Sequence, residues 1–171
     1  IIFSHASGTR DLEYKKRIEI DAIIKIASMT KLVTTIAALQ LCEKGLIDLD
    51  KGMDVYLPNF AKPKILVNFS QKYKPNFKIT KRTPSIRELI THTSGYVYPF
   101  FNVNAMAAQK SGVTQKDDGF SSKHFNVPLA FEPGTKWEYG IGIGWLGLVI
   151  EEVSGCKLGS YFNDFIFDAL E

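Results

Sequence analysis

Residues 28–44 read SMTKLVTTIAALQLCEK and are followed by Gly45. The apolar side chains of this stretch recur at helical spacing, and a glycine just beyond the last turn is a common helix stop. The stretch therefore predicts a helix that begins near Ser28. Lys31, three residues further on, then lies on the same helix face as Ser28.

Ser28 and Lys31 form an S-x-x-K tetrad, a pattern that permits nucleophilic catalysis. A serine hydroxyl becomes a useful nucleophile when a base lies beside it. An ordinary lysine, with a pKa of about 10.4, keeps its proton at neutral pH, so Lys31 must be desolvated or lie near another cation to act as that base. The plainer interpretation is an N-cap serine followed by a surface lysine, and the tetrad alone favours it. A second tetrad, Ser154 to Lys157, lies where a helix ends and lacks a fixed geometry.

Composition excludes several classes of protein. The 171 residues are 45% hydrophobic and 23% charged, which is ordinary for a globular domain and excludes disorder. The net charge of +3 is not gathered into a basic block, so a nucleic-acid partner is unsupported. The longest nearly apolar run, residues 140–150, is far shorter than the roughly 20 residues of a membrane span. No targeting signal is readable, so the compartment stays open.

Cysteines and histidines give no sign of a metal site or a cofactor. Cys42 and Cys156 do not form a metal-binding or disulfide-scaffold spacing and are expected to be small buried side chains. His5, His92 and His124 lack paired metal-ligand spacing. His92 follows a short predicted helix, where a histidine complements the last carbonyls, and this structural role is preferred over catalysis.

The rest of the chain predicts an α+β architecture with few strands. Residues 1–4 are expected to end a strand, and residues 59–83, rich in lysine and interrupted by prolines, to form a long surface excursion. Ser85 to Glu88 matches a helix capping box, and the short helix it opens should end near Gly95.

The second half of the chain is expected to contain an irregular stretch and then two helices. Residues 102–127 are polar and predicted to be irregular, whereas residues 145–153 predict a helix that ends at Gly155. Residues 158–170 predict an amphipathic helix whose apolar face needs a partner. Gly142 to Gly147 satisfies G-x-G-x-x-G, the pattern of a dinucleotide-binding turn. Such a turn lies in a β-α-β unit, and no strand is predicted after this helix, so nucleotide binding is not favoured. The glycines are interpreted as permitting close helix packing.

Several segments, in order, resemble the serine β-lactamase and penicillin-binding-protein superfamily, in particular its class C β-lactamase, esterase and transesterase branch. The matching segments are IASMTK at 26–31, EKGLIDLD at 43–50, ELITHTSGY at 88–96, FEPG at 131–134 and WEY at 137–139. The resemblance implies a β-lactamase/DD-peptidase-like fold, with an antiparallel sheet flanked by helices and a mostly helical subdomain. It also implies that Ser28 is the acylated nucleophile, Lys31 its proton partner, and Tyr139 the phenol that helps activate the serine and protonates the leaving group. His92 and Ser94 belong to a family landmark outside the catalytic centre.

The sequence departs from the family pattern in two ways. The tyrosine motif of the family often reads Y-x-N, whereas the third residue here is Ile141, which favours ester hydrolysis or acyl transfer over true β-lactamase activity. The family's K-T-G or H-x-G motif does not follow Tyr139 in this chain. Residues 1–171 are therefore expected to be a partial domain, truncated at both ends, whose core is shared with further sequence.

The function expected from the residues and the resemblance is a serine hydrolase or acyltransferase that works through a Ser28 acyl-enzyme, without metal or organic cofactor. Its substrate would be a small ester, lactone, amide or β-lactam-like molecule. The alternative is a non-catalytic relative that binds a ligand or a partner.

Overall fold

The computed structural model describes residues 2–58, 62–70, 74–114 and 127–170. The chain divides into two units, Ile1–Thr30 and Lys31–Glu171. The first unit is mostly irregular, with one antiparallel bridge between Thr9 and Arg17, and it contains the 3-10 turn η1 (Ala27–Met29). The predicted strand at residues 1–4 is wrong for its described part, since residues 2–4 have no regular structure. A strand needs a partner, and an apolar run alone does not supply one.

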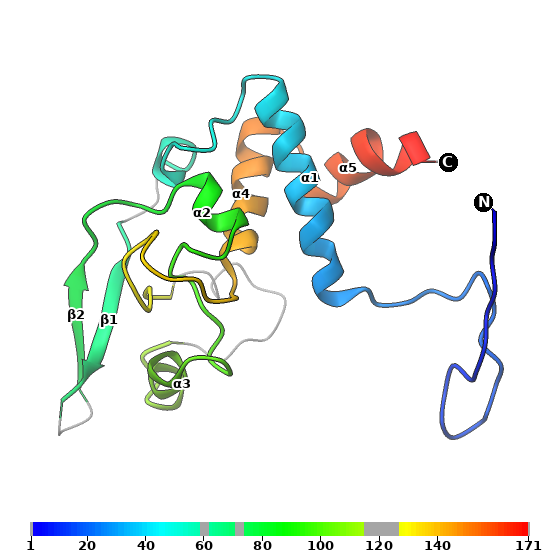
Figure 1. Cartoon of the computed structure of the whole chain (residues 1–171), viewed down its shortest axis with the longest axis horizontal. Coiled ribbons are helices and arrows are strands. Elements are labelled where there is room, and N and C mark those ends of the chain that lie inside the picture. The colour runs from blue at the N-terminus through cyan, green and yellow to red at the C-terminus, as the bar shows by residue number, and fades with distance from the viewer. Residues whose placement is uncertain (1, 59–61, 71–73, 115–126, 171) are drawn as a thin grey trace. The chain divides into compact units, whose positions relative to one another are not determined.

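The predicted first helix is confirmed as α1 (Thr30–Glu43), and Gly45 follows it with a positive φ of 71°. α2 (Ile86–Ile90) opens with the predicted capping box, because the Ser85 side chain accepts from the Glu88 N–H while the Glu88 side chain accepts from the Ser85 N–H. α4 (Gly142–Ser154) ends at Gly155, which adopts the left-handed conformation with φ 72°. Figure 1 labels the three helices. Local signals predict them, although α2 ends at Ile90, before the expected end near Gly95.

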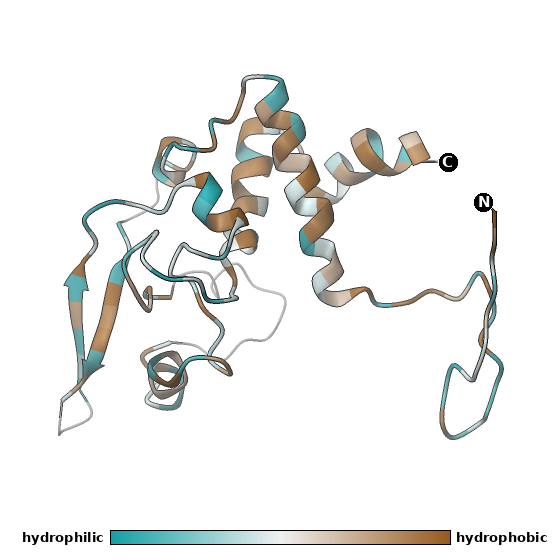
Figure 2. Cartoon of the chain, viewed as in Figure 1, coloured by the Kyte–Doolittle hydropathy of each residue, from teal (hydrophilic) through white to brown (hydrophobic). Residues whose placement is uncertain are grey.

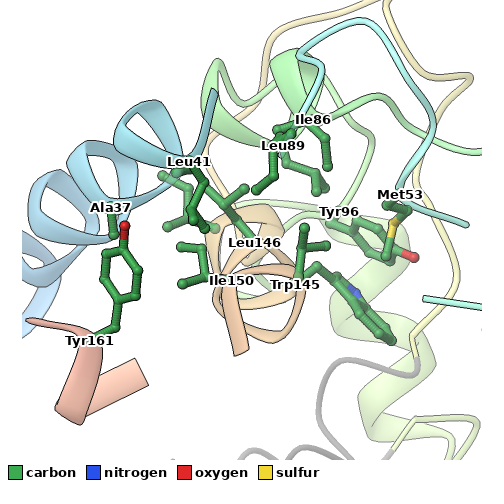
Figure 3. Packing of buried hydrophobic residues seen from close by; sticks show 14 of the residues in the cluster. Ala37, Leu41, Met53, Ile86, Leu89, Tyr96, Trp145, Leu146, Ile150 and Tyr161 are labelled. Carbon is green, nitrogen blue, oxygen red and sulfur yellow. The ribbon is translucent and has the colours of Figure 1, made fainter. Parts of the chain in front are cut away.

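The core of the second unit is built where α1, α2 and α4 meet. Figure 3 shows Leu41 of α1 above Leu146 and Ile150 of α4, with Leu89 of α2 on the same side. All four side chains are buried. In Figure 2 the apolar residues along α1 and α4 are coloured brown. Removing such contacts typically costs about 2–5 kcal/mol per large aliphatic side chain.

The predicted surface excursion at residues 59–83 is wrong, because it contains the hairpin of β1 (Lys64–Phe69) and β2 (Pro75–Ile79). The strands are antiparallel, Leu66 lies opposite Phe77, and the register shifts between Leu66 and Asn68. The bulge and the many lysines in and around the strands obscure the period-two pattern, while Pro75 opens its strand, where a proline is tolerated. Leu129 extends the sheet edge: its N–H donates to the Lys64 carbonyl and its carbonyl accepts from the Leu66 N–H, both at 2.8 Å.

The predicted irregular stretch at 102–127 is also corrected, because α3 (Val103–Lys110) lies within it. The Asn102 side chain caps this helix by accepting from the Asn104 and Ala105 N–H groups. Ala108 is its one fully buried residue, so the helix carries little apolar periodicity. Residues 115–126 of the stretch, with His124, lie outside the described residues.

The C-terminal segment is helical but is not one regular helix. It runs through α5 (Leu158–Phe162), a π-helical turn (Asn163–Phe167) and a 3-10 turn (Asp168–Leu170). Its predicted apolar face has a partner in the core, which Tyr161, Phe162 and Ile166 join. Leu170 is exposed.

The glycines at the start of α4 have the predicted packing role. A Cβ on Gly142 would lie 3.0 Å from the Ser94 Oγ, and one on Gly147 would lie 3.0 Å from a Leu158 methyl group. Cys42 and Cys156 are unpaired and half-buried, and both pack against the core cluster. Across the described residues, no helix is long and apolar enough to cross a membrane.

Candidate active site

Lys31 lies in the first turn of α1, half-buried against aromatic side chains from two distant segments. Its Nζ donates a hydrogen bond to the Tyr98 hydroxyl at 3.2 Å. The same Nζ is 5.0 Å from the centroid of the Tyr139 ring and 5.5 Å from that of the Tyr98 ring. Lys31 is therefore not the free surface lysine of the plainer interpretation.

The pKa of Lys31 is shifted in the opposite direction from the one that the sequence analysis requires of a base. Burial opposes the charged amine, but hydrogen bonds with the Tyr139 and Tyr98 hydroxyls outweigh burial and raise the pKa of Lys31. A base would need the opposite shift. The structure thus keeps Lys31 as an ammonium at neutral pH, suited to stabilise negative charge and to donate a proton.

Tyr139 lies half-buried in an aromatic cluster. Its ring centroid is 4.5 Å from that of His92, 5.7 Å from that of Tyr98 and 6.3 Å from that of Phe101. The next residue, Gly140, passes so close to the Tyr96 and Val97 backbone that a Cβ would overlap it. Only glycine fits there, and the tight approach fixes the backbone that carries Tyr139.

His92 lies at the centre of the contacts that hold this segment. It follows Thr91, the C-cap of α2, and takes a left-handed backbone with φ 59°. The Thr93 N–H reaches back to the Glu88 carbonyl at 3.0 Å, as in a Schellman helix end. The His92 Nδ1 accepts from the Gly140 N–H at 3.3 Å, and its carbonyl accepts from the Glu138 N–H at 3.0 Å.

The predicted role of His92 as a cap of the last helical carbonyls is therefore corrected, because its ring contacts the Tyr139 segment instead. Burial and, secondly, the positive charge of Lys31 lower the pKa of His92 below its ordinary value of 6.5. The imidazole is thus neutral at pH 7, as the acceptor role of Nδ1 requires.

Ser28, the predicted nucleophile, is an exposed residue of the 3-10 turn η1, directly before α1. Ile26, not Ser28, is the N-cap of this turn, so the serine is not a simple N-cap. Ala27 before it has a positive φ of 47°, a strained conformation for a residue with a Cβ. Its pairing with Lys31 and Tyr139 stays a prediction.

Tyr98 is the site residue that sequence reasoning missed. It lies three residues after Gly95, in a segment without regular secondary structure, and no local pattern marks it. Only the fold brings its hydroxyl to the Lys31 amine. Trp137, two residues before Tyr139, is exposed and packs edge-to-face with His92, the ring centroids being 6.3 Å apart.

An apolar cavity of about 50 Å³ adjoins this cluster. Its walls come from α3, from β1 and from residues 127–130, and they include Tyr98 and Ile141. Tyr98 thus joins two features, since its hydroxyl binds Lys31 while the residue lines the cavity. Ile141, which stands where the family often has asparagine, contributes an apolar wall. No group of three or more potential metal-binding His, Cys, Asp or Glu side chains occurs among the described residues.

The chain belongs to the beta-lactamase family, whose family model matches residues 1–171. This match confirms the resemblance seen in the sequence and, with the solved structures below, the β-lactamase/DD-peptidase-like α+β fold.

The chain has esterases and acyltransferases among its relatives within the family. The chain is 35% identical to the lovastatin esterase of Penicillium rubens, over 99% of this chain and 43% of the relative. It is 33% identical to the monacolin J acid methylbutanoyltransferase of Aspergillus terreus, over 87% of this chain and 36% of the relative. Unliganded simvastatin synthase from Aspergillus terreus has a similar structure, with a TM-score of 0.84 and 30% identity over 95% of this chain and 42% of that chain. The chain thus spans about two-fifths of the length of these relatives.

Proposed function

We propose that this chain carries the acyl-enzyme site of a serine hydrolase or acyltransferase, with Ser28 as nucleophile and Lys31 and Tyr139 as proton-transfer groups. The observation that carries the proposal is the Lys31 ammonium, 5.0 Å from the Tyr139 ring centroid and hydrogen-bonded to Tyr98. The S-x-x-K spacing supports the assignment of Ser28.

The proposed reaction has two steps. In the first, the Ser28 Oγ attacks the ester carbonyl and its proton passes to the Tyr139 oxygen, whose negative charge the Lys31 ammonium stabilises. The carbonyl–alkoxy bond then breaks, the departing alcohol takes the proton from Tyr139, and an ester of Ser28 remains. In the second step, water or another alcohol loses its proton to Tyr139, attacks the acyl-enzyme and releases the acid or a new ester, while Ser28 recovers its proton.

The surroundings support an ester with a small apolar acyl group. The cavity lined by Tyr98 and Ile141 offers about 50 Å³, room for a few carbon atoms, and Ile141 offers no hydrogen bond to an amide. The relatives named as an esterase and as a methylbutanoyltransferase also favour ester and acyl-transfer chemistry.

The decisive experiment is covalent labelling of the protein at its natural length. A serine-reactive alkylphosphonate should label the wild type, and p-nitrophenyl butanoate should give a burst of p-nitrophenol. Ser28→Ala should abolish both signals. Ser154→Ala, which alters the second S-x-x-K tetrad, is the matched control and should behave like the wild type. Equal labelling of the Ser28→Ala variant, or no labelling of the wild type, would overturn the proposal; the latter result favours a non-catalytic binding protein.

A further inference from the structure

The His92 ring connects three parts of the site. Its Nδ1 accepts from the Gly140 N–H at 3.3 Å, its ring centroid lies 4.5 Å from that of Tyr139, and the charge of Lys31 acts on it. The backbone of His92 is left-handed, with φ 59°, a conformation that is uncommon outside glycine but that histidine, like asparagine and aspartate, adopts more readily than other residues. With this backbone the half-buried ring lies against the Tyr139 segment.

The contact with Gly140 exists only for neutral histidine. In the imidazolium form both ring nitrogens carry protons, so Nδ1 has no lone pair for the Gly140 N–H. The two N–H groups would then point at one another. At the same time, the new positive charge would lie in the neighbourhood of the Lys31 ammonium, and like charges in a half-buried site repel.

We propose that His92 is a positioning residue, whose neutral imidazole holds Tyr139 beside Lys31 and whose protonation releases Tyr139 and lowers turnover. The inference rests on the proposed function for its catalytic consequence, but its structural part stands on the Gly140 and Tyr139 contacts alone. The histidine acts through Tyr139 and has no role of its own in bond making.

The charged groups around His92 favour the neutral form. Lys31 of α1 brings a positive charge that opposes an imidazolium, and the Tyr139 phenol lies against the ring, with its centroid 4.5 Å away. The Glu138 carboxylate is occupied elsewhere, since it accepts from the Asn102 side chain at 2.9 Å and from Lys136 Nζ at 2.8 Å. The lowered pKa of His92, due to burial and then to Lys31, agrees with this geometry.

Two variants separate positioning from a merely structural role. His92→Asn keeps an acceptor oxygen, tolerates the left-handed backbone and does not titrate. His92→Phe keeps an aromatic ring against Tyr139 but has no acceptor. Both are made in the protein at its natural length, and folding is checked by thermal melting.

The first measurement is kcat for p-nitrophenyl butanoate from about pH 4.5 to 8. Wild-type kcat should fall on the acid side with a midpoint below 6.5, the ordinary histidine value, while KM changes little. One pH unit below the midpoint, kcat should be about tenfold lower than at neutral pH, because about one molecule in ten then has a neutral histidine. His92→Asn should have a lower kcat at neutral pH, since the ring contact is lost, but no acid limb from this group. The same acid limb in His92→Asn would overturn the inference.

The second measurement does not depend on catalysis. The Gly140 amide and the Tyr139 ring resonances, followed by NMR, should titrate together in the wild type with the midpoint of the kcat profile. They should not do so in His92→Asn. If the Gly140 amide resonance of the wild type does not change with pH, the inference is overturned even if the protein is an active esterase. If these resonances titrate but Ser28-dependent labelling is absent, the contact between His92 and Gly140 is supported and the proposed function is overturned.

Discussion

The Lys31 Nζ lies 3.2 Å from the Tyr98 hydroxyl, although 67 residues separate them in the sequence. The contact joins the first turn of α1 to the irregular segment that follows α2. It gives the half-buried lysine a hydrogen-bond partner, and with Tyr139 it keeps the amine charged. Tyr98 also lines the apolar cavity, so one residue links the proposed proton-transfer groups to the proposed acyl site.

Tyr98→Phe should weaken catalysis and shift its pH dependence. The hydroxyl is one of the groups that raise the pKa of Lys31, so its removal lowers that pKa, and the decline of kcat at high pH begins at a lower pH. The loss of one hydrogen bond to a partly exposed charge should reduce kcat about tenfold. The control is Tyr56→Phe, which removes a hydroxyl bonded to the Asp48 N–H at 2.7 Å. Superimposable pH profiles for wild type and Tyr98→Phe would contradict this prediction.

Tyr139→Phe should lower kcat by about 10²–10⁴, the usual contribution of a general acid–base group. The aromatic contacts with His92 and Phe101 depend on the ring, so the melting temperature should change little. Steady-state kinetics and thermal melting test the two parts separately. A variant that keeps kcat within about threefold of the wild type would remove Tyr139 from proton transfer.

Ala105→Leu should narrow the range of acyl groups that the protein accepts. Ala105 lines the apolar cavity and is half-buried, so a larger side chain there occupies part of the roughly 50 Å³. We expect kcat/KM for p-nitrophenyl butanoate to fall about 10-fold or more, with much less effect on the acetate ester. Ala107→Leu, on the same helix but not in the cavity wall, is the control. Equal losses for both esters would show that acyl chains bind elsewhere.

Gly140→Ala should destabilise the fold by about 1–3 kcal/mol, because its Cβ would overlap the Tyr96 and Val97 backbone. The same displacement should move Tyr139 and reduce turnover. Gly159→Ala provides the matched control, since nothing lies within 4 Å of a Cβ there and alanine favours a helix. Chemical unfolding compares the two variants. A Gly140→Ala protein as stable as Gly159→Ala would mean that the segment relaxes freely.

Glu88→Gln should remove a pH-dependent part of the stability. Burial disfavours the Glu88 carboxylate, but bonds from Arg82 and the Ser85 N–H outweigh it and lower the pKa of Glu88 below 4.5. A carboxyl whose folded pKa is lowered contributes stability above its unfolded value, and that stability is lost as the pH falls through the folded value.

The wild type should therefore exceed Glu88→Gln in unfolding free energy by about 1 kcal/mol at neutral pH, with the difference shrinking below about pH 4. Urea unfolding across this range measures it. Asp50→Asn, which breaks the exposed ion pair with Arg87, should have little effect. A Glu88→Gln difference that does not depend on pH would refute the role of the charge.

Local signals in the sequence were enough for α1, for α4 and for the capping box of α2. The apolar spacing of α1 and α4, the glycines at 45 and 155, and the reciprocal bonds of Ser85 and Glu88 act over a few residues, so they are readable without a fold. β1, β2 and α3 were missed because a bulge, surface lysines and a single buried alanine left no clear period.

The sequence by itself determined which family this chain belongs to and marked Ser28, Lys31 and Tyr139 as the proposed catalytic residues. Tertiary structure decided the state of Lys31 and the identity of its neighbours. Tyr98 and His92 both come from the segment that follows α2, and they reach the site through a long-range hydrogen bond and a left-handed backbone. A pKa depends on burial and on charges a few ångströms away in space, and those distances exist only once the chain has folded.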